Sequence, residues 1–229
     1  MIEQLLPTTA VAREAFDDSV PVTLHPEEEK ALGGRAVDKR RREFGTARRC
    51  AHEALAELGH VDVPVLSGPR REPCWPDGIV GSITHCDGYR AAAVARVQDL
   101  TSIGIDAEPH RPLPDGVLDS IASPAETRLL ATLHADHRHV CWDRLLFCAK
   151  ESVYKAWYPL AQRWLGFEEA HVEIDPATGG FTARLLVEGP LLPDGIRLTG
   201  FTGRWLARNG LLVAAISLPA ASDATGRAA

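Results

Sequence analysis

The sequence predicts an α+β protein made of two similar halves that meet near residues 98–103. A length of 229 residues allows one large domain or two small ones, and an apolar content of 45% is enough for a buried core. Each half shows helical patterns together with alternating strand patterns that end in tight turns. The similarity of the halves lies in the order of their elements, because the sequence itself contains no internal repeat.

The first half is expected to hold two helices and two well-marked strands, after a short strand and a turn within residues 2–20. One helix begins at Pro26, where a proline and three acids suit a first turn. The second helix carries an apolar stripe and stops at Gly59. A loop rich in proline and glycine leads to the strands, which Cys86-Asp87-Gly88 joins as a hairpin. The predicted ranges are 39–58 for the second helix, 64–78 for the loop, and 79–85 and 89–97 for the strands.

The second half is expected to open with a short strand that ends at Pro109, followed by a loop. Ser123-Pro124 and Glu126 then form a strong helix start, with an N-cap, a proline at N1 and an acid at N3. A long helix and three or four strands follow, and Arg208-Asn209-Gly210 marks a hairpin between the last two strands. These later elements are placed near 140–163, 171–174, 181–187, 197–207 and 211–218.

The long helix combines one apolar stripe with a charged face. Its apolar residues follow the spacing of a buried stripe, namely Trp142, Leu145, Ala149, Val153, Ala156 and Leu160. Glu151 and Lys155 lie about 40° apart on a different face, with Lys150 beside them. A Glu–Lys pair of this spacing adds only about 0.2–0.5 kcal/mol to an isolated helix, and most such pairs do no more. A functional role therefore depends on what the fold brings near this face.

Two acids in the strand before Pro109 are candidates to lie near the charged face of this helix. Residues i and i+2 of a strand point to the same side, so Asp106 and Glu108 present two carboxylates together. Such carboxylates repel one another unless a cation lies between them or one is protonated. Oxygen-only ligands suit a hard ion such as Mg²⁺, and Glu151 would supply a third oxygen. The alternative is a solvated edge strand with two unrelated acids.

Charge and cysteine usage narrow the function class and the compartment. The net charge is −6, yet seven residues between Arg35 and Arg49 are basic and only two are acidic. A concentrated basic patch on an acidic chain favours a localised anionic ligand over a polyanion. Five cysteines without CxxC spacing indicate reduced thiols, and hence a cytoplasmic protein. Neither a signal peptide nor a membrane span is expected, and residues 220–229 are expected to form a disordered tail.

Other motifs carry weaker signals. Thr84 and His85, at the end of a strand, are candidates to donate hydrogen bonds to a phosphate, although a single histidine is more often structural or a surface residue. His134, His137 and His139 are dense enough for a metal site, but their polar surroundings favour a solvated loop. The sequence contains no phosphate-binding P-loop, no dinucleotide fingerprint and no nucleophile elbow.

Three motifs together resemble those of the large, surfactin-type 4′-phosphopantetheinyl transferases. Gly104-Ile-Asp-Ala-Glu108 is similar to the family's G-(I/V)-D-x-E metal motif, and residues 81–85 match the S-x-(S/T)-H segment before it. Phe147-Cys-Ala-Lys-Glu-Ser-Val-Tyr-Lys155 is similar to the (F/W)-x-x-K-E-(A/S)-x-x-K motif. The order and spacing of all three fit, and the likeness, which is closest to the actinobacterial branch, covers residues 25–218.

This resemblance implies two similar subdomains, each an antiparallel three-stranded sheet with helices, that form an intrachain pseudo-dimer. Residues 1–101 would contact the 3′-phosphate and pyrophosphate of coenzyme A, and residues 102–219 would carry the metal and catalytic motifs. The implied reaction transfers the phosphopantetheine arm of coenzyme A to a serine of an apo acyl or peptidyl carrier protein. Adenosine 3′,5′-bisphosphate is released. The expected partners are coenzyme A and carrier proteins, with no nucleic acid or membrane, and the protein is expected to be a monomer.

The resemblance also assigns roles to residues. Asp106, Glu108 and Glu151 would hold Mg²⁺, with Mn²⁺ as a possible substitute, and Glu151 would also activate the carrier serine, directly or through water. Lys155 and Lys150 would stabilise charge on the attacked phosphate. The other coenzyme A contacts fall on Thr84 and His85 for the pyrophosphate, Arg40 and Arg48 for the 3′-phosphate, and Arg70 or Arg71 in place of a loop lysine. The segment 157–167 would form part of the carrier-binding surface.

Two other function classes remain open at this point. A Mg²⁺-dependent phosphatase or nuclease would use the same carboxylates to activate water. A nucleic-acid-binding protein would use the arginine run at 35–49, would need no Mg²⁺ and would bind less tightly as salt increases. The acidic remainder of the chain argues against this last class.

Overall fold

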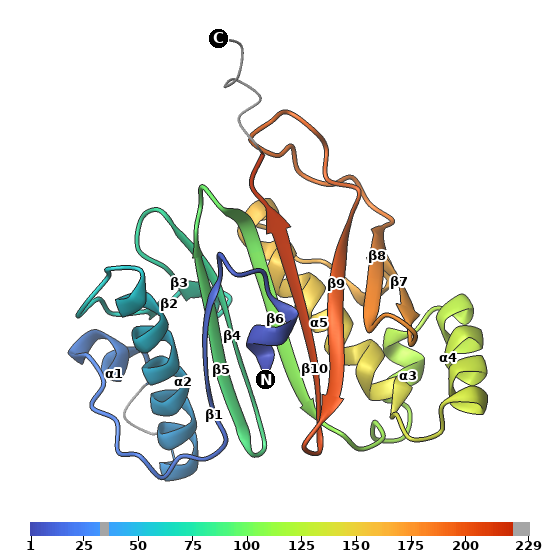
Figure 1. The fold of residues 1–229 in the computed structure, drawn as a ribbon, viewed down its shortest axis with the longest axis horizontal. Coiled ribbons are helices and arrows are strands. Elements are labelled where there is room, and N and C mark those ends of the chain that lie inside the picture. Colours follow the sequence, from blue (N-terminus) through green and yellow to red (C-terminus); the bar gives the residue numbers. More distant parts are fainter. Residues whose placement is uncertain (33–36, 222–229) are drawn as a thin grey trace.

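Two antiparallel sheets stand side by side at the centre of the molecule, with helices packed on their outer faces (Figure 1). The structure is a computed structural model and describes residues 1–32 and 37–221. The first sheet has the order β1-β5-β4 and the second has the order β6-β10-β9-β8-β7. Their strands span Val11–Ala15 (β1), Ile79–Cys86 (β4), Tyr89–Arg96 (β5), Leu100–Pro109 (β6), Ala170–Asp175 (β7), Gly180–Leu185 (β8), Gly200–Arg208 (β9) and Leu211–Pro219 (β10).

The α+β class is confirmed, but the second sheet has five strands where the resemblance implied three. The hairpin of β7 and β8 causes the difference, because β8 pairs with β9 and extends the sheet outward. The loop predicted at 64–78 also contains two very short paired strands, Leu66–Ser67 (β2) and Pro73–Cys74 (β3). The predicted hairpin between β9 and β10 is present, and its Asn209 and Gly210 both have positive φ, as a primed turn requires.

The helices follow the predicted starts and stops closely. They span Ile2–Leu5 (η1), Pro26–Leu32 (α1), Asp38–Glu57 (α2), Val117–Ile121 (α3), Pro124–Asp136 (α4), Trp142–Ala161 (α5) and Phe167–Glu169 (η2). Ser123 and Glu126 form the predicted capping box at the start of α4. No helix in the described ranges is long and apolar enough to cross a membrane. Residues 222–229 of the predicted tail, and Arg35 at the start of the basic run, lie outside the described residues.

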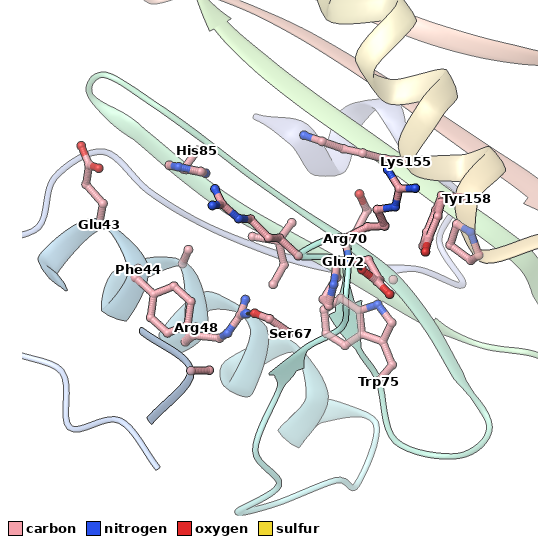
Figure 2. A pocket seen from close by; sticks show the side chains of 18 of the residues that line it. Glu43, Phe44, Arg48, Ser67, Arg70, Glu72, Trp75, His85, Lys155 and Tyr158 are labelled. Atoms are coloured by element: carbon pink, nitrogen blue, oxygen red, sulfur yellow. Dashed lines mark hydrogen bonds between the residues drawn. The ribbon is translucent and has the colours of Figure 1, made fainter. Parts of the chain in front are cut away.

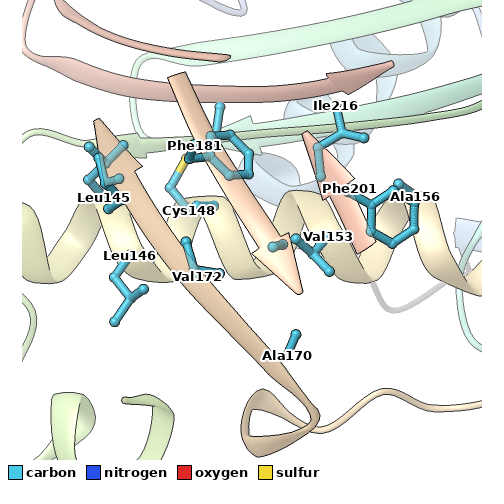
Figure 3. Packing of buried hydrophobic residues seen from close by; sticks show 14 of the residues in the cluster. Leu145, Leu146, Cys148, Val153, Ala156, Ala170, Val172, Phe181, Phe201 and Ile216 are labelled. Carbon is cyan, nitrogen blue, oxygen red and sulfur yellow. The ribbon is translucent and has the colours of Figure 1, made fainter. Parts of the chain in front are cut away.

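The apolar stripe of α5 is the centre of the larger core. Leu145, Val153 and Ala156 are buried against the five-stranded sheet, where Val172, Phe181 and Phe201 meet them (Figure 3). A second apolar cluster lies between the sheets and contains residues of η1, β5, β6 and β10. Because both faces of β6 are covered, its residues are buried whichever side they point to. This burial determines the environment of the two strand acids.

The seam between the sheets is made by hydroxyl groups. Strand β6 is the edge of its sheet, and the N–H groups of Ile105 and Ala107 donate to the hydroxyls of Ser82 and Thr84 on β4, at 3.1 and 3.0 Å. On the other face of β6, a Cβ placed at Gly104 would lie 2.0 Å from the carbonyl oxygen of Ser152. Only glycine therefore lets α5 approach β6 this closely. The close approach brings the charged face of α5 onto the acids of β6.

Candidate active site

A cavity of about 480 Å³ lies between α2 and α5 (Figure 2). Helix α2 and the end of α1 form one wall, α5 forms the other, and β4 lies between them. The segment 67–75 closes one end and brings Trp75 and Glu72 to the cavity. Six of the ten residues that the sequence predicted for the site line this cavity, namely Arg40, Arg48, Arg70, His85, Glu151 and Lys155.

The acids of β6 point toward α5, as their spacing predicts. Asp106 Oδ1 accepts a hydrogen bond from Lys155 Nζ at 2.6 Å, and Glu108 Oε2 accepts one from Arg144 Nη1 at 2.9 Å. Both donors belong to α5. Asp106 is only 5% exposed, so this pair lies at the base of the interface between strand and helix. The sequence therefore located the neighbour of the charged helical face correctly.

The carboxylates of this group are close enough to affect one another's ionisation. Burial and the charge of Asp106 raise the pKa of Glu108, although Arg144 offsets part of the effect. Burial and the charge of Asp106 also raise the pKa of Glu151, against the opposing charge of Lys155. Two carboxyl groups thus bind a proton more readily than an isolated glutamate does. Of the two, Glu151 lines the cavity and is therefore placed to accept a proton from a bound molecule.

The donor set of these acids fits a hard divalent cation. Asp106 Oδ2 is buried and has no hydrogen-bond partner among the described residues, so one oxygen of the carboxylate remains to ligate an ion. The remaining donors, Glu108 and Glu151, are also carboxylates, the ligand type that Mg²⁺ prefers. The three acids do not, however, form a group within the described residues whose ligand atoms all lie within 4.8 Å of one another. Instead, Lys155 forms an ion pair with Asp106, and Arg144 forms one with Glu108.

The two lysines of α5 have different surroundings. Burial lowers the pKa of Lys155, but Asp106 and Glu151 outweigh this, and the pKa lies above its ordinary value. Lys150 was predicted to contact coenzyme A, and the structure places it elsewhere. Its Nζ lies 2.6 Å from the Phe167 carbonyl, 2.9 Å from that of Ala170 and 3.0 Å from Glu126 Oε1.

Lys150 is therefore a buried structural residue. Its ammonium group has three protons, and the three contacts leave none for a ligand. The residue is 3% exposed and does not line the cavity. Because Lys150 directly precedes Glu151, it points about 100° away around the helix. The match to the family motif assigned Lys150 to the site, but the helical rotation directs its side chain to Phe167, Ala170 and Glu126.

Thr84 is a second correction. It was predicted to donate to a phosphate, but its hydroxyl donates to Asp106 Oδ1 at 3.2 Å and accepts the N–H of Ala107. A hydroxyl has one proton, so none remains for a phosphate, and Thr84 is 1% exposed. Its role is to join β4 to β6 and to orient the Asp106 carboxylate. His85, the next residue, points the other way and does line the cavity.

The wall formed by α2 is positively charged. Arg40 Nη1 lies 2.9 Å from Nε2 of His85, and desolvation and the charges of Arg40 and Lys155 lower the pKa of that histidine. Arg48 is 5% exposed, lies over the Phe44 ring at 4.4 Å and donates to Ser67 Oγ at 3.0 Å. Burial lowers the pKa of Arg48, although Glu28 opposes the shift. Within residues 1–32 and 37–221, the buried Nε of Arg48 has no hydrogen-bond partner.

Comparison with known proteins identifies the family. A model described as the 4′-phosphopantetheinyl transferase N-terminal domain matches residues 27–95, and the 4′-phosphopantetheinyl transferase superfamily model matches residues 102–196. The chain is 55% identical over 222 residues to the 4′-phosphopantetheinyl transferase Svp of Streptomyces mobaraensis, covering 96% of this chain and 90% of that protein. The chain belongs to the 4′-phosphopantetheinyl transferase family.

Two further relatives of this transferase are similar over nearly their whole length. The chain is 49% identical over 224 residues to Npt of Nocardia iowensis, with 95% of this chain and 99% of that protein covered. It is 49% identical over 225 residues to PptT of Mycobacterium tuberculosis, with 95% and 98% covered. Both proteins are named as 4′-phosphopantetheinyl transferases. The resemblance inferred from three motifs is thus confirmed at the level of the family.

Three residues of this transferase that support the site were missed from sequence. Arg144 holds Glu108, Ser67 holds Arg48, and Glu126 holds Lys150. A signal existed for Arg144, because it precedes Glu151 by seven residues and therefore lies on the same helical face. Ser67 and Glu126 carried no such signal. Each comes from a segment distant in sequence that only the tertiary fold brings into contact.

Proposed function

We propose that this protein transfers the 4′-phosphopantetheine arm of coenzyme A to a serine of an apo carrier protein, with adenosine 3′,5′-bisphosphate as the other product. Membership in the 4′-phosphopantetheinyl transferase family supports this type of reaction. The single observation that supports the chemistry is one cavity lined both by arginines and a histidine and by Glu151 and Lys155, with the Asp106 carboxylate bound to Lys155 beneath it. A substrate that is both polyanionic and bound to a divalent cation matches that arrangement.

The basic wall would bind the nucleotide end of coenzyme A. Arg48 presents an unpartnered buried Nε and a guanidinium held in place by Phe44 and Ser67, so it is ordered before a ligand arrives. Arg40 lies beside His85 at the opposite end of the same wall. We assign Arg40 and Arg48 to the 3′-phosphate and His85 to the pyrophosphate. Arg70 and Arg71 both line the cavity and are candidates for a further phosphate contact.

The opposite wall would carry out the transfer. Asp106, Glu108 and Glu151 would hold Mg²⁺, which when bound supplies positive charge to the diphosphate. Glu151 would take the proton of the carrier serine hydroxyl, directly or through water, since its raised pKa favours proton binding. The serine oxygen then forms a bond to the phosphorus that carries pantetheine, and the bond from that phosphorus to the bridging oxygen breaks. Lys155 would stabilise negative charge on the departing phosphate.

Several finer assignments belong to this proposal. They are the surfactin-type class, the division of tasks between residues 1–101 and 102–219, Mg²⁺ in preference to Mn²⁺, and acyl and peptidyl carriers as partners. A cytoplasmic, monomeric protein without a nucleic-acid or membrane partner is also proposed. Against nucleic acid, the arginine run is divided: Arg41 pairs with Glu29, Arg49 pairs with Glu53, and Arg48 is buried. Such a run does not present one continuous basic strip.

The decisive test is incubation with coenzyme A, Mg²⁺ and a panel of apo carrier proteins. Mass spectrometry should show a gain of one phosphopantetheine unit on the carrier, located on a serine by peptide mapping. The amount of modified carrier should equal the amount of adenosine 3′,5′-bisphosphate formed. A phosphatase or nuclease would instead release phosphate or nucleotides with no change in carrier mass. That outcome across all the carriers would reject the proposed reaction.

A further inference from the structure

Outside the catalytic cavity, the part of the chain that the structure describes contains one group of three side chains whose ligand atoms are close enough to hold a metal ion. His25, Glu28 and His52 each offer a ligand atom, and these atoms all lie within 4.8 Å of one another. His25 immediately precedes α1, Glu28 lies in its first turn, and His52 lies on α2. The two imidazole rings meet edge to face, with centroids 5.0 Å apart. Residues distant in sequence thus converge at the junction of the two helices.

The carboxylate at the centre of this group is buried. Glu28 has an exposed fraction of 0%, and its Oε1 accepts from the Val65 N–H and from His52 Nε2, both at 2.8 Å. Its Oε2 accepts from the His25 N–H at 3.1 Å. Burial raises the pKa of Glu28, but these hydrogen bonds and the nearby His52 outweigh it, and the net shift is downward. A buried carboxylate that stays ionised, with imidazoles as its neighbours, is a strong ligand for a borderline metal.

A fourth ligand lies at the solvent side of the group. Asp62 Oδ1 is 3.8 Å from Nε2 of His25, and Asp62 adopts a positive φ of 59°. Its side chain is exposed and therefore free to turn toward the histidine. Two nitrogen and two oxygen ligands match the tetrahedral preference of Zn²⁺, in which ligand atoms are separated by roughly 3.3 Å at bond lengths of about 2.0–2.1 Å. The present separations require only small side-chain movements to reach that geometry.

We propose that His25, Glu28 and His52 form a zinc site, with Asp62 as the fourth ligand, that is separate from the catalytic acids. The site would tie α1 to α2. On zinc binding, the proton between His52 Nε2 and Glu28 leaves or moves to Nδ1, so that the metal replaces a hydrogen bond. Because Ala31 and Leu32 at the end of α1 line the catalytic cavity, the metal would also fix one edge of the coenzyme A wall. This proposal does not depend on the proposed reaction.

Cobalt(II) provides the test, since a tetrahedral site with nitrogen ligands gives intense visible absorption and an octahedral oxygen site gives very weak absorption. The purified metal-free protein is titrated with Co²⁺ and then with Zn²⁺, in excess Mg²⁺ to occupy the catalytic acids. We expect one Co²⁺ per chain with intense bands, and stoichiometric displacement by Zn²⁺. Zinc should also raise the melting temperature, because it binds only the folded state.

Matched variants locate the site. His25→Ala and His52→Ala should weaken Zn²⁺ binding at least about 100-fold, more than the loss of an outer contact does. Glu28→Gln should do the same, but because Glu28 is buried, far-UV circular dichroism must first show that the variant is folded. His134→Ala, which removes an exposed histidine on α4, and Asp106→Asn, which alters the catalytic group, should leave the bands unchanged. Weak absorption in the wild type, bands that survive both histidine variants, or bands lost in Asp106→Asn would overturn the proposal.

Discussion

On the α2 side of the cavity the charged groups are two arginines and Glu43, with His85 of β4 beside them, whereas α5 contributes Glu151 and Lys155 above the acids of β6. Each side contains like charges that disfavour one another. Arg40 lowers the pKa of both His85 and Arg48, and Asp106 raises the pKa of both Glu108 and Glu151. The comparison teaches that like charges lie close together on both sides, and that on the α5 side the pairs Lys155–Asp106 and Arg144–Glu108 offset only part of this repulsion. In the proposed reaction, coenzyme A and its cation would offset the rest.

The largest effect should follow from neutralising the carboxylate at the cavity wall. Glu151→Gln keeps the shape of the side chain but removes both a proton acceptor and a metal ligand, so transfer should fall by at least about 10³-fold. Steady-state assays with a carrier protein measure the change. Glu173→Gln, on the exposed side of β7, is the matched control and should be fully active. Glu151 is preferable to Asp106 for this test, because loss of Asp106 also leaves Lys155 without its partner.

Substitutions of the two lysines of α5 should have different effects, with Lys150 affecting stability and Lys155 affecting activity. Lys150→Met removes a buried ion pair and leaves the buried Glu126 carboxylate without its ammonium partner, which should reduce the free energy of unfolding by about 3–5 kcal/mol. At temperatures well below its melting point this variant should keep most of its turnover. Lys155→Met should lose transfer even where it is fully folded. Equal losses of activity in both folded variants would show that Lys150, like Lys155, takes part in the transfer reaction.

On the basic wall, Arg48→Gln should act on substrate binding. Loss of a charge-assisted contact to the 3′-phosphate should raise the KM for coenzyme A by about 10–100-fold, the equivalent of roughly 1.5–3 kcal/mol. The KM for 3′-dephospho-coenzyme A should change much less. Arg42→Gln, an exposed arginine of the same helix, should affect neither substrate. If Arg48→Gln raised the KM values for both substrates equally, the role of Arg48 would be packing against Phe44 rather than phosphate recognition.

The smallest effect concerns pH and stability. The pKa of Glu151 is raised in the folded state, so ionisation is disfavoured there, and the stability that the carboxyl contributes below its unfolded pKa is lost as the pH rises through the folded pKa. Glu151→Gln should therefore melt higher than the wild type at neutral pH, by roughly 2–4 °C, and the difference should vanish in acid. Differential scanning calorimetry without divalent cations measures this.

The sequence alone determined the family, the order of the elements and the acids of the site. Periodicity was sufficient for these: alternation placed Asp106 and Glu108 on one side of β6, and helical spacing separated the apolar stripe of α5 from Glu151 and Lys155. The capping box of α4 and the turn at Asn209-Gly210 were predictable for the same reason, because each is formed by residues close together in the sequence. Each of these features depends on residues a few positions apart, where backbone geometry fixes the relation.

Only the tertiary structure decided which side chains remain available to a ligand. Lys150 and Thr84 match the family motifs, yet Glu126 and Asp106 occupy their hydrogen-bonding capacity. The approach of His52 to His25 and Glu28 likewise could not be predicted from local spacing. A side chain's hydrogen-bonding capacity is limited, and whether it is already used depends on partners that only the packing of distant segments brings near. That limit is why motif membership did not translate into a role in the site for every residue.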